Sequence, residues 1–330
     1  MKRVCSAVLG LCMLLGVVAG FSSVAAAASS LADSPYKDQL YIEVSALGSL
    51  AYFYDHMMGM ERVGEELGVR TEYVGPPDYD MNAMIAAFEQ AIAMQPQGIV
   101  VVGFEDSLNP IVKKAIDAGI PVVTVDADLP DSERVAFVGT GNYNAGRMGA
   151  EKMAEVIDGK GQVAIMTKPG QSNLEERVQG YRDGLARYPD IEIVQIGDTQ
   201  SDPVVAAQAA ATLLQMFPDL AGIACVEAAG GAGSAMAVRE AGLVGKVKII
   251  SMDRDNDVVN SIIEGTITAS VAQQTALMPY YAVQILFNLA NSNVNISSNN
   301  KAAGVAGIPA AVDTGVIIVD ASNAQYFLRD

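Results

Sequence analysis

The chain of 330 residues has little from which to build a metal or disulfide site. It contains one histidine, His56, and three cysteines, of which Cys5 and Cys12 lie in its first 12 residues. If that segment is removed, Cys225 is alone, and no disulfide can form within the chain. Its apolar surroundings predict a buried small side chain. With neither a cysteine pair nor a histidine cluster for zinc, we expect no metal and no cofactor.

Basic residues are also scarce. The chain has 21 Lys and Arg against 38 Asp and Glu, a net charge of −17. Without Lys2 and Arg3, 19 basic residues face 38 acidic ones, which gives −19. Nucleic acid and anionic lipid surfaces both attract basic proteins, so this charge argues against either as a partner. The hydrophobic content of 51% instead fits a packed globular protein.

The first 28 residues have the three parts of a secretory signal. Lys2 and Arg3 precede an apolar run from Val4 to about Val18, and four alanines occupy 25–28. This pattern predicts a signal peptide over 1–28 and a mature protein in the periplasm. A retained membrane anchor is disfavoured because the apolar run is short. Lipid attachment at Cys12 is disfavoured because the bulky Leu11 precedes it.

The remaining chain alternates short apolar segments with amphipathic ones. In the first part, strands are predicted at 40–44, 70–74, 98–102, 121–125 and 135–138, with helices at 53–67, 81–94 and 109–118. In the second part, strands are predicted at 162–166, 191–196, 221–226, 247–251, 268–272 and 314–319. Its helices are predicted at 144–157, 174–187, 203–216, 233–241, 256–264 and 277–289, and the polar stretch 291–300 is predicted as a loop. The rhythm indicates an α/β fold of two doubly wound, parallel-sheet domains.

In such sheets, ligands bind beside the carboxyl ends of the strands, and the predicted strand ends carry polar residues. These residues are Asp126, Asn173, Arg177, Glu227, Asp253 and Gln273, and the aromatic residues Tyr52, Phe53 and Tyr54 follow the first strand. Carboxylates and amides accept from sugar hydroxyls, a guanidinium donates to them, and aromatic faces cover sugar C–H groups. The alternative is that each acidic residue only caps the next helix. His56, on the first helix, is predicted at the helix surface or the rim of a pocket.

Five segments of the chain resemble periplasmic sugar-binding proteins of the ribose-binding type. They are GIPVVTVD at 119–126, ERVQGY at 176–181, IISMD at 249–253, ASVAQ at 269–273 and VDTGV at 312–316. Together they cover about 38–320 in the order of the family. The resemblance implies that Asp126, Arg177, Asp253 and Gln273 contact the sugar. Departures at 48–54 and at Glu227 put ribose itself in doubt and favour another pentose, a hexose, a polyol or a furanose.

The resemblance also implies two lobes that close on the ligand about a three-strand hinge. The crossings are expected near 139–142, near Gln273 and near 311–313, with lobes of 38–139 plus 274–311 and of 140–273 plus 312–330. The function implied is that of the extracytoplasmic binding component of an ABC importer, a monomer that serves a membrane permease with its ATPase.

A sensory receptor that signals to a chemoreceptor or histidine kinase would use the same cleft, and the sequence does not separate the two. A repressor is opposed by the leader and by the charge. A sugar hydrolase or isomerase could use Asp126 and Asp253 as paired carboxylates, but no nucleophile and base are readable, and no enzyme is expected.

Overall fold

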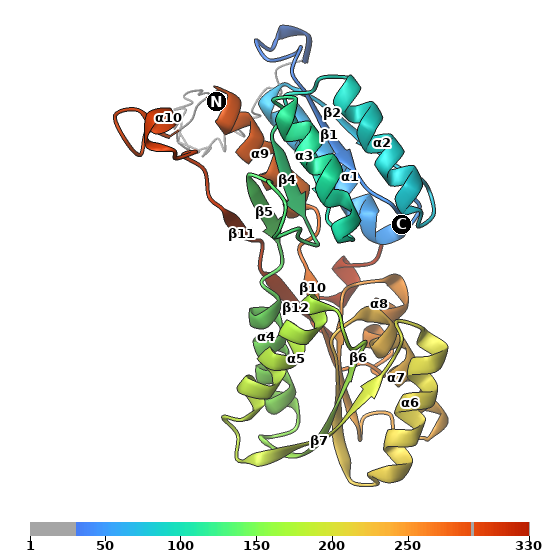
Figure 1. The fold of residues 1–330 in the computed structure, drawn as a ribbon. Helices are drawn as coiled ribbons and strands as arrows, with labels where there is room; N and C mark the ends of the chain where they lie inside the picture. Colours follow the sequence, from blue (N-terminus) through green and yellow to red (C-terminus); the bar gives the residue numbers. More distant parts are fainter. Residues whose placement is uncertain (1–30, 292–293, 330) are drawn as a thin grey trace, which may run out of the picture.

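The protein consists of two lobes stacked end to end (Figure 1). The computed structural model describes residues 31–291 and 294–329, so the predicted signal peptide at 1–28 lies outside the described residues. The described residues form two six-stranded sheets, one in each lobe. None of the helices in these residues is both long and apolar enough to cross a membrane.

The sheet of the N-terminal lobe has the order β11-β5-β4-β3-β1-β2, and its neighbouring strands are all parallel. The strands are β1 (Leu40–Val44), β2 (Arg70–Val74), β3 (Gly98–Val102), β4 (Val122–Val125), β5 (Ala136–Gly139) and β11 (Ala311–Asp313). Helices α2 (Met81–Ala93) and α3 (Asn109–Asp117) pack on one face. Helices α1 (Ala51–Leu67) and α9 (Leu277–Asn291) cover the other face.

The C-terminal lobe repeats this order as β12-β10-β9-β8-β6-β7. Its strands are β6 (Lys160–Thr167), β7 (Asp190–Asp198), β8 (Leu220–Cys225), β9 (Lys248–Met252), β10 (Ala269–Gln273) and β12 (Val316–Asp320). Here β12 runs antiparallel to β10, and the other pairs are parallel. The faces are covered by α4 (Asn142–Val156) and α5 (Ser172–Leu185) on one side, and by α6 (Pro203–Met216), α7 (Ala228–Glu240) and α8 (Asn256–Ile263) on the other.

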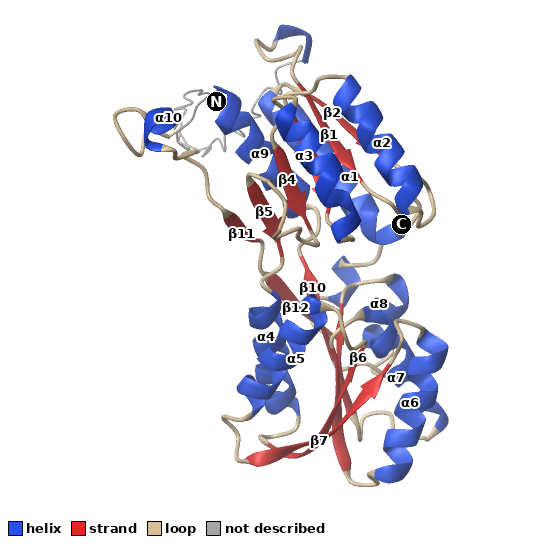
Figure 2. Ribbon diagram, viewed as in Figure 1, coloured by secondary structure: helices blue, strands red, loops and turns tan. Residues whose placement is uncertain are grey.

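Helices therefore lie on both sides of each sheet, as Figure 2 shows, and the predicted fold class is confirmed. The central strands are buried on both faces, which is why their sequences are continuous apolar runs. Local capping fixes several boundaries. Gly68 ends α1 with a left-handed φ of 65°, and Asp202 caps α6 by accepting hydrogen bonds from the amides of Val204 and Val205.

Some predicted boundaries are wrong. Helix α7 begins at Ala228, five residues before the predicted start, because Glu227 caps it and its glycines are helical. A Cβ at Gly231 would overlap the Ser251 side chain, so the absence of a side chain permits this packing. The predicted polar loop at 291–300 ends in a short helix, α10 (Asn300–Ala303). The crossover strand that the resemblance implies near 311–313 is present as β11, at the edge of the N-terminal sheet.

The chain passes between the two sheets at three places: after β5, after β10, and between β11 and β12. Hydrogen bonds join these crossings. Thr140 donates to Gln273 at 2.7 Å, the Gly141 amide donates to Asp313 at 2.7 Å, and Gln274 donates to the Thr314 carbonyl at 2.6 Å. The crossings therefore form one connected junction between the lobes.

Candidate functional site

Polar residues from both lobes meet at this junction. A narrow cleft, too tight in this structure to admit a water molecule, is lined by Tyr52 and Thr275 on one side and by Asp253, Arg254, Asp255, Gln273 and Arg329 on the other. Tyr52 also lies close enough to Asp126, Asp253 and Arg177 for their charges to act on its hydroxyl. The site thus brings together residues that are distant in the sequence, at the carboxyl ends of strands in both sheets.

The N-terminal lobe contributes Tyr52 and Asp126. Asp126 directly follows β4 and has a left-handed φ of 63°, which is uncommon for a residue with a side chain. Its carboxylate accepts a hydrogen bond of 2.7 Å from the Tyr52 hydroxyl, which comes from the first turn of α1. Burial, followed by the charges of Asp126 and Asp253, raises the pKa of Tyr52 well above its ordinary value, so Tyr52 is a neutral donor.

The C-terminal lobe contributes Arg177, a guanidinium on α5 that is only 5% exposed. Its Nε donates to the Asn142 side chain at 2.9 Å, and one Nη donates to the Val226 carbonyl at 2.9 Å. These bonds fix the plane of the guanidinium. A Cβ at Gly146 on α4 would overlap the Arg177 carbonyl, so close packing of α4 against α5 also sets its position.

Asp253 directly follows β9 and has a φ of 64°. Its Oδ1 accepts a hydrogen bond of 2.8 Å from the Gln273 amide, whose oxygen accepts from Thr140 at 2.7 Å. Burial raises the pKa of Asp253 to about 6, although the nearby Arg177 acts in the opposite direction. A carboxylate with one protein donor retains lone pairs that can accept from a ligand.

The other predicted contact residues lie in different surroundings. Phe53 is 2% exposed and packs in the lobe core against Phe104, whereas Tyr54 is 50% exposed. Glu227 caps α7: its oxygens accept from the amides of Ala229 and Gly230 and from Thr199. Asn173 accepts from the Leu174 amide at the start of α5. Their roles in ligand binding stay predictions.

The prediction that His56 lies at a surface or rim is wrong. Its side chain is fully buried, and Nδ1 lies 2.5 Å from the carboxylate of Glu43, which is itself fully buried in β1. Burial alone would lower the pKa of His56, but the charge and hydrogen bond of Glu43 raise it above its ordinary value. One feature of the sequence indicates a buried partner for Glu43: it is the one charged residue in the otherwise apolar strand LYIEV.

Sequence reasoning also missed Asp55, which lies on α1 one turn after Tyr52 and has a side chain that is 3% exposed. Its Oδ2 accepts from the guanidinium groups of Arg254 at 2.5 Å and Arg329 at 2.8 Å, both in the C-terminal lobe. Burial acts against ionisation, but Thr275, Arg329 and Arg254 together lower the pKa of Asp55 below its ordinary value. Arg254 could have been noticed because it follows Asp253 directly.

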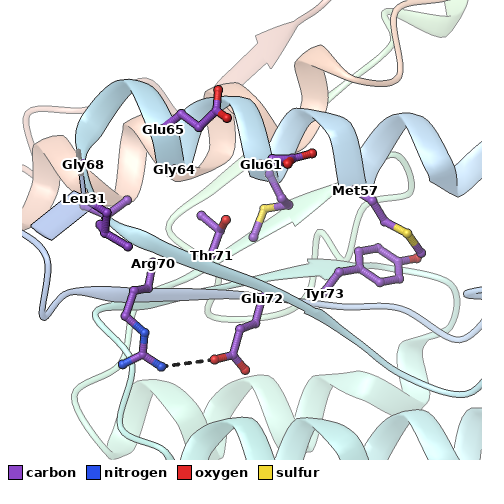
Figure 3. Close-up of a pocket in the computed structure, with 12 residues that line it drawn as sticks. Leu31, Met57, Glu61, Gly64, Glu65, Gly68, Arg70, Thr71, Glu72 and Tyr73 are labelled. Atoms are coloured by element: carbon purple, nitrogen blue, oxygen red, sulfur yellow. Dashed lines mark hydrogen bonds and ion pairs between the residues drawn. The ribbon is translucent and has the colours of Figure 1, made fainter. Parts of the chain in front are cut away.

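A wider groove of about 590 Å³ lies on the flank of the N-terminal lobe, between α1 and β2 (Figure 3). Its lining includes Glu61, Glu65 and Glu72, and the one guanidinium drawn there, from Arg70, already pairs with Glu72 at 3.2 Å. The groove extends along α1 to Gly68, the end of the helix nearest the amino ends of the strands. It therefore lies away from the strand ends where ligands of such sheets bind.

Comparisons with known proteins agree with this architecture. Residues 46–293 match the model of the periplasmic binding protein domain. The chain is similar to the D-ribose/D-allose-binding protein of Pseudomonas aeruginosa, with 26% identity over 301 residues that cover 88% of this chain and 92% of that protein. It is also similar to the D-allose-binding periplasmic protein of Escherichia coli, with 27% identity over 74% of this chain and 83% of that protein.

Two solved structures cover nearly the whole described chain. The sugar-binding protein of a sugar ABC transporter from Bacillus halodurans is 37% identical, with a TM-score of 0.84. The arabinose-binding protein AraP from Geobacillus stearothermophilus is 35% identical, also with a TM-score of 0.84. Each match covers 88% of this chain and 100% of the other chain.

Proposed function

The chain belongs to the periplasmic binding protein family, and we propose that it is the solute-binding component of an ABC importer. The ligand is a monosaccharide or a similar small polyhydroxylated solute, held between the two lobes. The similarity to the sugar-binding protein of a sugar ABC transporter and to AraP supports this function. It also favours transport over the sensory alternative.

One observation of the structure carries the proposal. Tyr52 and Asp126 from one lobe lie near Arg177 and Asp253 from the other, which places carboxylates on both sides of the cleft. A sugar hydroxyl donates one hydrogen bond and accepts others, so it needs acceptors and donors close together. Asp126, Asp253 and Gln273 supply acceptors, Arg177 supplies a fixed donor, and the Tyr52 ring offers an apolar face.

The balance of charge favours a neutral solute over a sugar acid. Arg254 and Arg329 already contact the carboxylate of Asp55, and the charge of Arg177 acts on Asp253. Asp126 adds a further carboxylate, with the Tyr52 hydroxyl as its donor. A ligand carboxylate would therefore approach Asp126 and Asp253, with Arg177 as the guanidinium left to offset both.

The proposed lobes are 38–139 plus 274–311 and 140–273 plus 312–330. The division of the strands between the two sheets supports the first two boundaries, with crossings at 140–141 and 274–276. The last crossing lies at 314–315, because β11 keeps 312–313 in the N-terminal sheet. Closure about these crossings would bury the sugar. The protein is proposed to act in the periplasm without covalent chemistry, and to deliver the sugar to a membrane permease with its ATPase. A monomer stays a prediction, which light scattering can measure.

Titration calorimetry of the mature chain against pentoses, hexoses and polyols tests the proposal. We expect saturable binding of at least one of these solutes. Arg177→Ala should weaken that binding roughly 100-fold, because it leaves buried acceptors without a donor. Arg147→Ala, which removes an exposed arginine paired with Glu151 on α4, is the matched control. Absence of binding by every solute, or equal affinity of wild type and Arg177→Ala, would refute the site.

A further inference from the structure

A buried ion cluster joins the two lobes beside the proposed sugar site. Asp55 belongs to α1 in the N-terminal lobe, and Arg254 and Arg329 belong to the C-terminal lobe. The two guanidinium groups are 22% and 15% exposed, against 3% for the Asp55 side chain. The three charges are thus largely removed from water, where their interaction is much stronger than on a surface.

The C-terminal lobe holds both arginines in place. Arg254 lies in the loop between β9 and α8, and Arg329 lies in the tail after β12. The backbone of Arg329 exchanges two hydrogen bonds of 2.9 Å with the side chain of Asn256, and its guanidinium also lies 3.5 Å from Asp255. The tail is therefore fastened to the start of α8, with its charged end directed at the other lobe.

The N-terminal lobe holds Asp55 against the hinge. The Thr275 hydroxyl, in the crossing between β10 and α9, donates to Asp55 at 2.5 Å. One turn further along α1, a Cβ at Gly59 would overlap the Ala276 carbonyl. Helix α1 therefore rests directly on this crossing. Rotation of the C-terminal lobe about the hinge would draw the guanidinium groups away from a carboxylate that the hinge keeps in place.

We propose that Asp55, Arg254 and Arg329 form a closure latch, which limits the opening of the ligand-free cleft and so raises sugar affinity. Separation of the latch breaks both ion pairs of the buried Asp55 carboxylate, which is costly unless water enters. If the closed form is the one that binds sugar, the apparent dissociation constant falls in proportion to the fraction of protein that is closed before binding. Arg254 and Arg329 also line the cleft, so the ligand-free distance between the lobes, rather than affinity alone, identifies the latch. This inference rests on the proposed function.

The test combines lobe distance with affinity. Cys225 is buried, so cysteines introduced at the exposed positions Met94 and Met216, one in each lobe, can carry a pair of spin labels. In Arg254→Gln/Arg329→Gln, pulsed electron paramagnetic resonance should show a longer label distance without sugar and an unchanged distance with saturating sugar. Calorimetry should show sugar affinity weakened about tenfold.

Arg187→Gln is the matched control, because its ion pair with Glu151 lies within the C-terminal lobe. If the double variant does not fold, Arg329→Gln alone makes the same prediction with a smaller shift. An unchanged ligand-free distance would overturn the latch, because the loss of a direct sugar contact would lower affinity without moving the lobes. If the wild type binds no sugar, the proposed function fails, and the ligand-free distance alone then decides whether the latch exists.

Discussion

The two lobes share one strand order and place an aspartate at the same topological position, but they support it differently. Asp126 follows β4 with a φ of 63°, and Asp253 follows β9 with a φ of 64°. In the N-terminal lobe, Asp126 accepts from Tyr52 on α1, the helix that also carries the buried pair of His56 with Glu43. In the C-terminal lobe, Asp253 lies beside Arg177, which is held by hydrogen bonds and by closely packed helices.

The shared topology therefore determines where the two aspartates lie, whereas the residues packed around each aspartate determine its hydrogen bonds and charge environment. The N-terminal lobe buries a charged pair below its aromatic residues. The C-terminal lobe relies on glycines: a Cβ at Gly146 or Gly180 would overlap backbone atoms of the facing helix. The pair of Glu43 and His56 in the N-terminal lobe should therefore be sensitive to changes of charge, and the contact of α4 with α5 in the C-terminal lobe to changes of volume.

The largest expected effect is on the charged pair of the N-terminal lobe. His56→Leu leaves Glu43 buried without its partner and should lower the free energy of unfolding by about 3–5 kcal/mol. Glu43→Leu/His56→Leu removes both polar side chains and should recover most of that loss, because buried pairs are often replaceable by apolar side chains. Urea unfolding measures both. Equal stability of the single variant and wild type would show that the pair is not needed.

A smaller effect is expected from volume in the C-terminal lobe. Gly146→Ala inserts a methyl group against the Arg177 carbonyl and should cost about 1–3 kcal/mol of stability through overpacking. Sugar affinity should fall as well, because a displaced α5 would move Arg177 out of the proposed binding site. Met148→Ala, at a partly exposed position of the same helix, is the control. Thermal unfolding and calorimetry that show the two variants to be alike would contradict the role of close packing.

The smallest expected effect is a dependence of sugar affinity on pH through Asp253. Burial raises the pKa of Asp253 to about 6, so its carboxyl is ionised at pH 7 and mostly protonated at pH 5. If sugar hydroxyls donate to the ionised form, affinity should be nearly full at pH 7, fall by about half at pH 6 and be roughly tenfold weaker at pH 5. Asp253→Asn should bind more weakly and remove this dependence. Calorimetry at the two pH values that gave equal affinities for wild type would exclude Asp253 as such an acceptor.

Much of the fold could be predicted because its strands are short, apolar and buried on both faces. The strand ends were also readable, and Asp126, Arg177, Asp253 and Gln273 lie together at the junction between the lobes. The predicted start of α7 is wrong because glycine usually disfavours helices. At Gly231 the packing leaves no room for a side chain, so glycine is needed within the helix.

The ion pairs could not be predicted. Glu43 and His56 meet only through the rotation of α1 against the sheet, and Asp55 meets Arg329 across 274 positions of the chain. Sequence spacing on one helix or strand carries no information about such contacts. Glu227 shows the reverse case, in which a residue predicted to contact ligand has a local partner as the cap of α7.

A crystal structure of the mature chain with the sugar of highest affinity tests the central claim most directly. The account predicts one sugar in the cleft, with hydrogen bonds to Asp126 from the N-terminal lobe and to Arg177 and Asp253 from the C-terminal lobe. A sugar bound to one lobe alone, or in the groove between α1 and β2, would contradict it.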